Sequence, residues 1–417
     1  IGSTFSPERV FVASDGVLAL RAAGREAGTN EGAYEDLVDR IDTQPDRALA
    51  LAAASTSLRS DEPVKRFGVV HDVVSFPWRN GRMRLELSRA SHLPVAVETV
   101  RTYPHNLRWA AFGDVTIRTE YVNWTLQSSG ITWPMQHKVT WNGEPWRDIT
   151  VQKVALDATP VPSDSFAIGD SARAQFRAAA WQSPSAFRFG TRGTPVDIAP
   201  NIVQLPDFWA MTMVKQPDGV VLFEAHLSDT YFDEVLAEAQ RRYPGTPVKA
   251  VVVTSDPWAH VGGIRQVVAR GIPIYAHEAS IPFLTRLVKT PHTLTPDLLQ
   301  RSPRAPKFVA VSGKTVIGSG PERIELYPVG GPYAERMIMA HFPAQRAIYG
   351  SDLIFQNRGP DGKPANGFLA TPARDLRRAI EREKLSADVV FCVQNGCAWD
   401  GAAFMRDESR PPAKPQS

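Results

Sequence analysis

The stretch Val251-Val252-Val253-Thr254-Ser255-Asp256-Pro257-Trp258-Ala259-His260-Val261-Gly262-Gly263 decides the fold of the C-terminal half. It joins an apolar strand, Val248–Thr254, through a polar loop to a helix that begins at Gly262. The same alternation continues on both sides of it. Further strands are expected at Ile202–Leu205, Ala210–Lys215, Val220–Glu224, Ile272–Ala276, Phe308–Val311, Glu322–Leu326, Met337–Phe342, Ala347–Gly350 and Asp388–Cys392, and helices at Ser228–Arg242, Ala279–Leu287 and Arg374–Lys384. Strands that alternate with helices predict a layered α/β unit.

Further landmarks stand in a fixed order around that stretch. They are Glu224 after an apolar strand, Tyr275-Ala276-His277-Glu278-Ala279, Gly330-Gly331-Pro332-Tyr333-Ala334, Tyr349-Gly350-Ser351-Asp352-Leu353 and Val393-Gln394-Asn395-Gly396. Taken together, residues 196–417 resemble the metallo-β-lactamase fold superfamily. The resemblance implies a four-layer αβ/βα sandwich with its site at the loops that carry these landmarks.

The metal-binding positions of that family are largely replaced here. In the family, the loop reads His-x-His-x-Asp-His, and a later His, a bridging Asp and a final His complete the set. These positions are occupied by Ser255, Pro257, Ala259, His260, Tyr333, Asp352 and Asn395. A catalytic zinc needs about three protein donors, and Pro257 and Ala259 provide none. We therefore expect no binuclear metal centre and no other cofactor. One alternative is a weak mononuclear site at His260 and Asp352, with Asn395.

The surviving polar residues suggest metal-free chemistry. If the fold is as the resemblance implies, His260, Asp352 and Tyr333 converge from three loops, and His226 faces the same cleft. His260 is then the candidate base, Asp352 its orienting partner and Tyr333 an acid or oxyanion donor. The alternative is that His260 and Asp352 form only a buried pair that holds two loops together.

Aromatic residues gather around the former motif. We expect an apolar cleft here, or else a vacated cavity filled by these side chains, at Trp209, Trp258, Ser255, Asn395 and Trp399.

These residues suggest two alternative functions. The first is a metal-independent hydrolase-like or lyase-like enzyme acting on a small apolar or cyclic substrate. The second is a pseudoenzyme that binds a small apolar or aromatic ligand, or a partner, without turnover.

The N-terminal half differs from the C-terminal half in its residue composition and hydrophobic periodicity. Residues 6–60 are expected to be helical, because the segments Gly32–Ile41 and Pro45–Leu58 carry Ala, Leu and charged residues at helical spacing. Strands rich in Val, Thr and aromatics follow, and Asn80-Gly81 and Asn142-Gly143 are hairpin turn signals that predict an antiparallel meander. The segments Phe112–Tyr121 and Gly130–Pro134 resemble the curved sheets of lipoprotein carriers of the LolA type. The whole chain is thus read as a helical segment at 1–63, an antiparallel sheet domain at 64–180, a linker at 181–200, the metallo-β-lactamase-like domain at 201–405 and a polar tail at 406–417.

The composition of the chain limits the classes of partner it can bind and the cellular compartments in which it can work. Lys and Arg number 47 against 44 Asp and Glu, so 47 − 44 = +3, a balance that argues against bulk nucleic-acid binding. No apolar run approaches the roughly 18 residues of a transmembrane helix. Cys392 and Cys397 pair if their Cα atoms lie within about 7 Å in an oxidising compartment. The pairing of the two resembled domains implies a bacterial envelope protein, periplasmic or secreted, with its signal peptide removed. An oligomer is compatible with the sequence.

Overall fold

The computed structural model describes residues 9–154, 162–179, 184–190, 193–207, 209–354, 356–358, 364–368, 370–394 and 397–406. The chain divides into two compact units. Unit 1 consists of residues 1–186 and 291–296, and unit 2 consists of residues 187–290 and 297–417. Each unit has its own hydrophobic core, so each is described by itself.

Unit 1 begins with a small sheet where the sequence predicted helix. Its antiparallel strands are β1 (Arg9–Ser14), β2 (Val17–Ala22) and β3 (Arg25–Gly28). The expectation of helix is wrong for this part, because Asp15-Gly16 adopts positive φ values of 49° and 74° and turns the chain back as a tight hairpin. The helices α1 (Glu31–Asp42) and α2 (Pro45–Ala54) follow, as predicted, and α3 (Asp170–Ala178) packs with α1 and β2 around a shared core.

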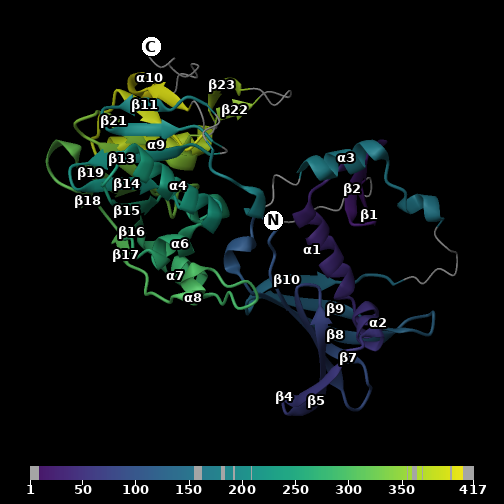
Figure 1. The fold of residues 1–417 in the computed structure, drawn as a ribbon. Helices are drawn as coiled ribbons and strands as arrows, with labels where there is room; N and C mark the ends of the chain where they lie inside the picture. Colours follow the sequence, from purple (N-terminus) through teal and green to yellow (C-terminus); the bar gives the residue numbers. More distant parts are fainter. Residues whose placement is uncertain are drawn as a thin grey trace. The chain divides into compact units, whose positions relative to one another are not determined.

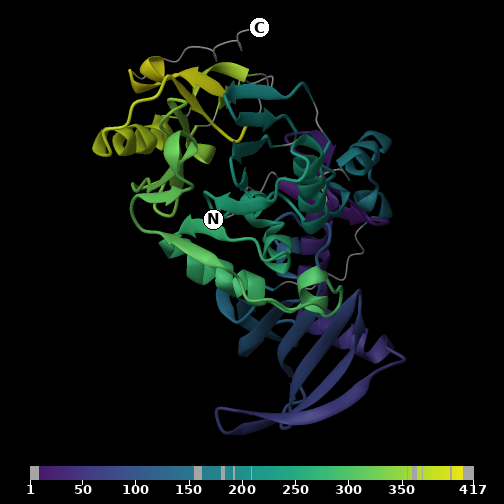
Figure 2. The ribbon, with the colours of Figure 1, turned by 60° about the vertical axis from the view of Figure 1, so that its left-hand side comes forward.

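The main sheet of unit 1 is a sequential antiparallel meander (Figure 2). Its strands are β4 (Arg59–Arg66), β5 (Val69–Trp78), β6 (Gly81–Ser88), β7 (Pro94–Arg101), β8 (Val115–Leu126), β9 (Thr132–Trp141) and β10 (Glu144–Thr150). The predicted meander is confirmed. The polar edge strand β4 was missed, because its residues are mostly exposed and lack an apolar face. Ala48 and Ala52 of α2 pack on the inner face of this sheet.

Unit 2 contains a mixed seven-stranded sheet and a six-stranded sheet (Figure 1). The first consists of β11 (Val196–Ala199), β12 (Ile202–Leu205), β13 (Met211–Gln216), β14 (Gly219–Phe223), β15 (Val248–Val253), β16 (Ile274–His277) and β17 (Phe308–Val311), and is parallel from β14 onward. The second consists of β18 (Thr315–Ile317), β19 (Ile324–Pro328), β20 (Ile338–Phe342), β21 (Ala347–Tyr349), β24 (Val389–Phe391) and β25 (Ala398–Asp400). The short strands β22 (Gln356–Arg358) and β23 (Pro364–Phe368) form a separate hairpin.

The two large sheets of unit 2 pack face to face. Val221 and Phe223 of β14 meet Leu326 of β19 and Phe342 of β20 in one buried core. The opposite face of the six-stranded sheet is covered by α9 (Ala370–Arg382) and α10 (Gly401–Met405). The helices α4 (Asp229–Arg242), α6 (Ile264–Ala269), α7 (Ile281–Lys289) and α8 (Leu298–Arg301) lie beside the seven-stranded sheet (Figure 1), and α4 and α6 each carry several buried residues. The short helix α5 (Trp258–Val261) comes between β15 and α6 in the chain.

These layers confirm the predicted fold class. Unit 2 is an αβ/βα sandwich, and an antiparallel sheet with N-terminal helices precedes it. Within the described residues, no helix is both long and apolar enough to cross a bilayer.

A disulfide closes the hairpin at the edge of the six-stranded sheet. Cys392 and Cys397 are bonded, their Cα atoms are 5.5 Å apart, and both side chains are fully buried. The sequence had left this pairing open. The geometry now assigns both cysteines a structural role.

Replacing both cysteines by alanine is expected to lower the free energy of unfolding of unit 2 by about 2 kcal/mol. The bridge closes only a short loop, so the entropy it removes from the unfolded chain is modest. Urea denaturation under non-reducing conditions measures the change. The single variant Cys392→Ala should lose about as much as the double variant, and an unchanged denaturation midpoint would contradict the assigned role.

Candidate functional site

A buried carboxylate connects the ends of two neighbouring strands in unit 2. Glu224 follows β14 and is fully buried. It accepts hydrogen bonds from the backbone N–H and the hydroxyl of Thr254, the residue after β15, with the N–H at 3.1 Å. The hydroxyls of Tyr349 and Ser351 also lie 3.4 Å from its Oε1. Glu224 therefore ties together the carboxyl ends of strands from both sheets.

The backbone around this carboxylate adopts an unusual conformation. Glu224, Leu227 and Ser351 have φ values of 71°, 62° and 49°. Residues other than glycine rarely adopt positive φ, and such positions cluster at sites that the surrounding structure holds in place. The local geometry thus marks the loops around Glu224 as the candidate site.

His260 lies between two carboxylates at this point. It is on α5, and its side chain is 1% exposed. Its Nε2 is 2.7 Å from Oδ2 of Asp352, and its Nδ1 is 3.1 Å from Oε2 of Glu224. Burial alone lowers the pKa of His260, but the charges of Glu224 and Asp352 outweigh it and raise that pKa from 6.5 to about 10. At neutral pH His260 is therefore a buried imidazolium.

Asp352 is the member of this group closest to solvent. It lies on the short turn after β21, and its side chain is 17% exposed. Its second oxygen, Oδ1, is buried without a hydrogen-bond partner among the residues that the structure describes. The structure thus brings together His260 and Asp352, as the sequence predicted, and adds Glu224 on the other side of the ring.

Tyr333 lies in a neighbouring loop and faces solvent. Its side chain is 47% exposed, and its backbone N–H donates to Oδ2 of Asp375 at 2.9 Å. Gly331 allows this approach, because its φ is 113° and a Cβ there would meet the Asp375 carboxyl at 2.5 Å. Partial burial and the charge of Asp352 raise the pKa of Tyr333 above 10.

His226 is buried close to His260, and its pKa is shifted in the opposite direction. The two ring centroids are 6.3 Å apart. Nδ1 of His226 lies 3.1 Å from the carbonyl oxygen of Ala259, which can only accept, so this nitrogen carries the proton. Burial lowers the pKa of His226 to about 4, so the ring is neutral at pH 7. Its Nε2 has no hydrogen-bond partner within the described part of the chain.

The predicted pocket residues lie in different surroundings in the structure. Trp209 and Trp258 pack edge to face with ring centroids 5.3 Å apart, and Trp209 also packs against the core between the sheets. Ser255 is buried at the end of β15. Trp399 is 2% exposed in the core under α9 and α10, so the expectation that it lines a cleft is corrected. Asn395 lies outside the described residues.

The donor set does not fit a metal ion. Both ring nitrogens of His260 face carboxylate oxygens within 3.1 Å. Metal binding needs a neutral imidazole, so its raised pKa opposes ligation. Among the described residues, no group of three or more His, Cys, Asp or Glu side chains has the arrangement of a metal site. Pro257 and Ala259 contribute no donor atoms.

Sequence reasoning missed the hydroxyl groups that complete this centre. The hydroxyls of Thr254 and Ser351 are 2.6 Å apart, and both lie against Glu224. The only signal was their position, since each is a small polar residue directly after or near the end of a buried strand. That signal is common at strand ends and does not by itself indicate a site.

The comparisons with known proteins found similarity to solved structures alone. No protein-family model matches the chain, and no curated protein matches it. The structure of DIM-1 metallo-beta-lactamase is similar at 16% identity and a TM-score of 0.37, covering 52% of this chain and 96% of that one. The metallo-beta-lactamase from Pontibacter korlensis is similar at 17% identity and a TM-score of 0.38, covering 52% and 97%. The metallo-beta-lactamase from Erythrobacter litoralis is similar at 17% identity and a TM-score of 0.38, covering 54% of this chain and 98% of that one. Such identities carry no information on what this chain does.

Replacing His260 by Asn is expected to destabilise unit 2 by about 3–5 kcal/mol, because two buried carboxylates then lose their shared cation. The pKa of His260 in the folded state, about 10, lies above its ordinary value of 6.5. Its stabilising contribution is therefore complete below pH 6.5 and is lost as the pH rises toward 10. The stability difference between wild type and variant should shrink across that window, as measured by urea denaturation at several pH values.

The exposed residue His92 provides the control for that measurement, because His92→Asn makes the same chemical change at the surface. This variant should keep the pH profile of the wild type. A wild-type advantage over His260→Asn that stays constant between pH 6.5 and 10 would show that His260 is not charged in the folded protein.

Proposed function

We propose that this chain is a binding protein for a small ligand or a partner, and that its metallo-β-lactamase-like unit performs no turnover. One observation carries the proposal. The only histidine among the predicted catalytic residues that contacts a carboxylate, His260, is buried, with Nε2 at 2.7 Å from Asp352 and Nδ1 at 3.1 Å from Glu224. A general base needs a free lone pair within reach of a substrate proton. An imidazolium between two carboxylates lacks one.

The other candidate groups do not replace it. The pKa of Tyr333 is raised, which makes its hydroxyl a weaker acid than an ordinary tyrosine. His226 is neutral and fully buried, out of reach of a substrate in solution. The metal-independent enzyme therefore remains the less supported hypothesis, and the buried pair that holds two loops together is the better description of His260 and Asp352.

The aromatic residues support the same conclusion. Trp209 and Trp258 pack against each other, so they fill space beside the former motif. The disulfide between Cys392 and Cys397 supports a periplasmic or secreted location, since such bonds persist in oxidising compartments. A weak mononuclear metallohydrolase would require a metal ion to displace the proton of His260, against the pull of both carboxylates.

The proposal is tested by a screen of ester, lactone and lactam hydrolysis in chelator and again with added zinc, together with metal analysis of the purified protein. We expect no turnover above background in either condition, and metal content far below one ion per chain. Asp352→Asn and the exposed Asp388→Asn form a matched pair of variants.

Two results would contradict the proposal, each in its own way. Turnover that persists in chelator and is lost in Asp352→Asn, but not in Asp388→Asn, would establish a metal-independent enzyme. Stoichiometric metal that is lost in Asp352→Asn would establish a mononuclear site.

A further inference from the structure

The turn between β4 and β5 in unit 1 carries a residue that its backbone conformation does not favour. Arg66 pairs with Val69, so the loop consists of Phe67-Gly68 alone. Their φ values, 47° and 85°, are those of a type I′ turn, whose first position favours Asn, Asp or Gly. The turn Asn142-Gly143 has nearly the same values, 48° and 85°, and follows that preference. Phenylalanine at positive φ is unfavourable, so the turn itself gives no reason for Phe67.

The most exposed apolar side chains gather at one end of this sheet. Successive turns of an antiparallel meander alternate between its two ends, so the β4–β5, β6–β7 and β8–β9 turns share one end. At the first of these turns Phe67 is fully exposed and Val69 is 56% exposed, and beside the third Leu126 is 69% and Ile131 is 42% exposed. Among the large apolar residues in the described part of the chain, Phe67, Leu126 and Val69 are the three most exposed. One such residue is ordinary, but a group of them at one end marks a contact surface.

The two apolar hairpins extend further than the hairpin between them. Paired residues cross the four strands β5 to β8 at one level, namely Val73, Glu86, Ala96 and Glu120. Beyond that level β5 continues to Val69 and β8 to Leu126, whereas β6 ends at Ser88 and β7 begins at Pro94. The tips of the β4–β5 and β8–β9 hairpins therefore project beyond the β6–β7 turn.

The same end of the sheet lacks acidic residues close to its turns. Residues 63–71, 87–95 and 122–136 contain no Asp or Glu. The cations there are Lys65, Arg66 and Arg89. Arg66 pairs with Glu86 and Arg89 with Asp72, both at 2.8 Å, while exposed Lys65 has no ion pair among the residues that the structure describes. Apolar tips with basic residues set behind them match a bilayer, in which phosphate groups lie above the acyl chains.

The edge of the sheet is built against a different occupant, a strand from another chain. The edge strand is β4, and it carries Glu62-Pro63 and Lys65. Proline cannot donate a backbone hydrogen bond, and charged side chains on an edge oppose strand addition. A second copy or an extended peptide therefore finds no template along β4.

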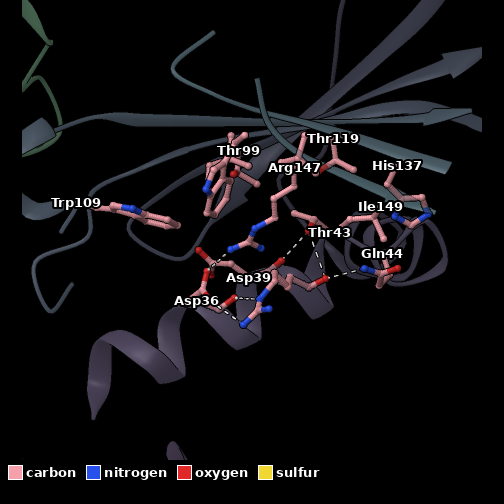
Figure 3. A pocket seen from close by; sticks show the side chains of 14 residues that line it. Asp36, Asp39, Thr43, Gln44, Thr99, Trp109, Thr119, His137, Arg147 and Ile149 are labelled. Atoms are coloured by element: carbon pink, nitrogen blue, oxygen red, sulfur yellow. Dashed lines mark hydrogen bonds and ion pairs between the residues drawn. The ribbon is translucent and has the colours of Figure 1, made fainter. Parts of the chain in front are cut away.

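The inner face of the sheet has no room for an acyl chain. Helix α1 and the start of α2 cover it and leave a cavity of about 70 Å³ (Figure 3). Cavities of about 150 Å³ are needed to hold a ring the size of benzene. Asp36 of α1, which lines this cavity, contacts Arg40 at 2.7 Å and Arg147 at 3.6 Å. Contact with lipid is therefore left to the tips of the hairpins.

We infer that this end of unit 1 docks on the surface of a bilayer that contains anionic phospholipids. Phe67 and Leu126 insert among the acyl chains, and Lys65 lies at the level of the phosphate groups. Trp124 and Trp133, partly buried behind the tip of the β8–β9 hairpin, stand where tryptophan is enriched at membrane interfaces. The inference goes beyond the proposed function, because it concerns unit 1 alone and holds whether or not unit 2 has turnover.

Flotation of the full chain with vesicles tests the inference. We expect binding to vesicles of phosphatidylcholine and phosphatidylglycerol in equal parts, and at least tenfold weaker binding to phosphatidylcholine alone. Phe67→Asn should weaken binding to the mixed vesicles at least tenfold, because burial of a phenylalanine side chain contributes at least that factor. This variant should fold at least as stably as the wild type, since Asn tolerates the φ of 47°. Phe11→Asn, at a 48% exposed phenylalanine of β1, should bind like the wild type.

A second measurement follows insertion directly. The only two cysteines of the chain are bonded to each other, so a cysteine introduced by Phe67→Cys can be labelled alone with a polarity-sensitive fluorophore. Its emission should shift to the blue on the mixed vesicles, and that of a label introduced by Phe11→Cys should not. Equal losses of binding in Phe67→Asn and Phe11→Asn, equal binding to both kinds of vesicle, or no shift at position 67 would overturn the inference. Absence of binding to either vesicle would overturn it in favour of a protein partner. None of these results bears on turnover at His260, so failure here is distinct from failure of the proposed function.

Discussion

The arrangement of unit 2 depends on one buried imidazole held between a buried and a partly buried carboxylate. His260 holds Glu224 at 3.1 Å and Asp352 at 2.7 Å, and these carboxylates follow strands of different sheets. Removing His260 leaves the two carboxylates without their shared cation. The centre therefore joins the two sheets of unit 2 at the loops that follow their strands.

This interaction also sets the charge state of its neighbours. His226, whose ring centroid lies 6.3 Å from that of His260, is neutral at pH 7 because burial, together with the positive charge of His260, lowers its pKa to about 4. Burial and the charge of Glu224 raise the pKa of Tyr349 well above 10, so it stays a hydrogen-bond donor. The backbone reaches this arrangement only with positive φ values at Glu224 and Ser351, a conformation that is unfavourable for residues other than glycine.

Unit 1 uses a buried histidine in a different way. Burial lowers the pKa of His137, and its buried Nε2 has no hydrogen-bond partner among the described residues. Both ring nitrogens of His260 lie within 3.1 Å of carboxylate oxygens instead. The likeness of this sheet to lipoprotein carriers remains a prediction.

The sequence alone determined the layered order of unit 2, because runs such as Val251–Val253 and the helices between them follow local periodicity. It also determined that Pro257 and Ala259 cannot hold a metal ion, since a missing donor atom is a property of the residue. It misjudged residues 9–28, where short hairpins outweigh helical composition. Only the tertiary structure decided that His260 lies between two carboxylates and that Trp399 is in the core. Charge and burial depend on groups that folding brings together from distant positions in the chain, and a single sequence does not reveal those distances.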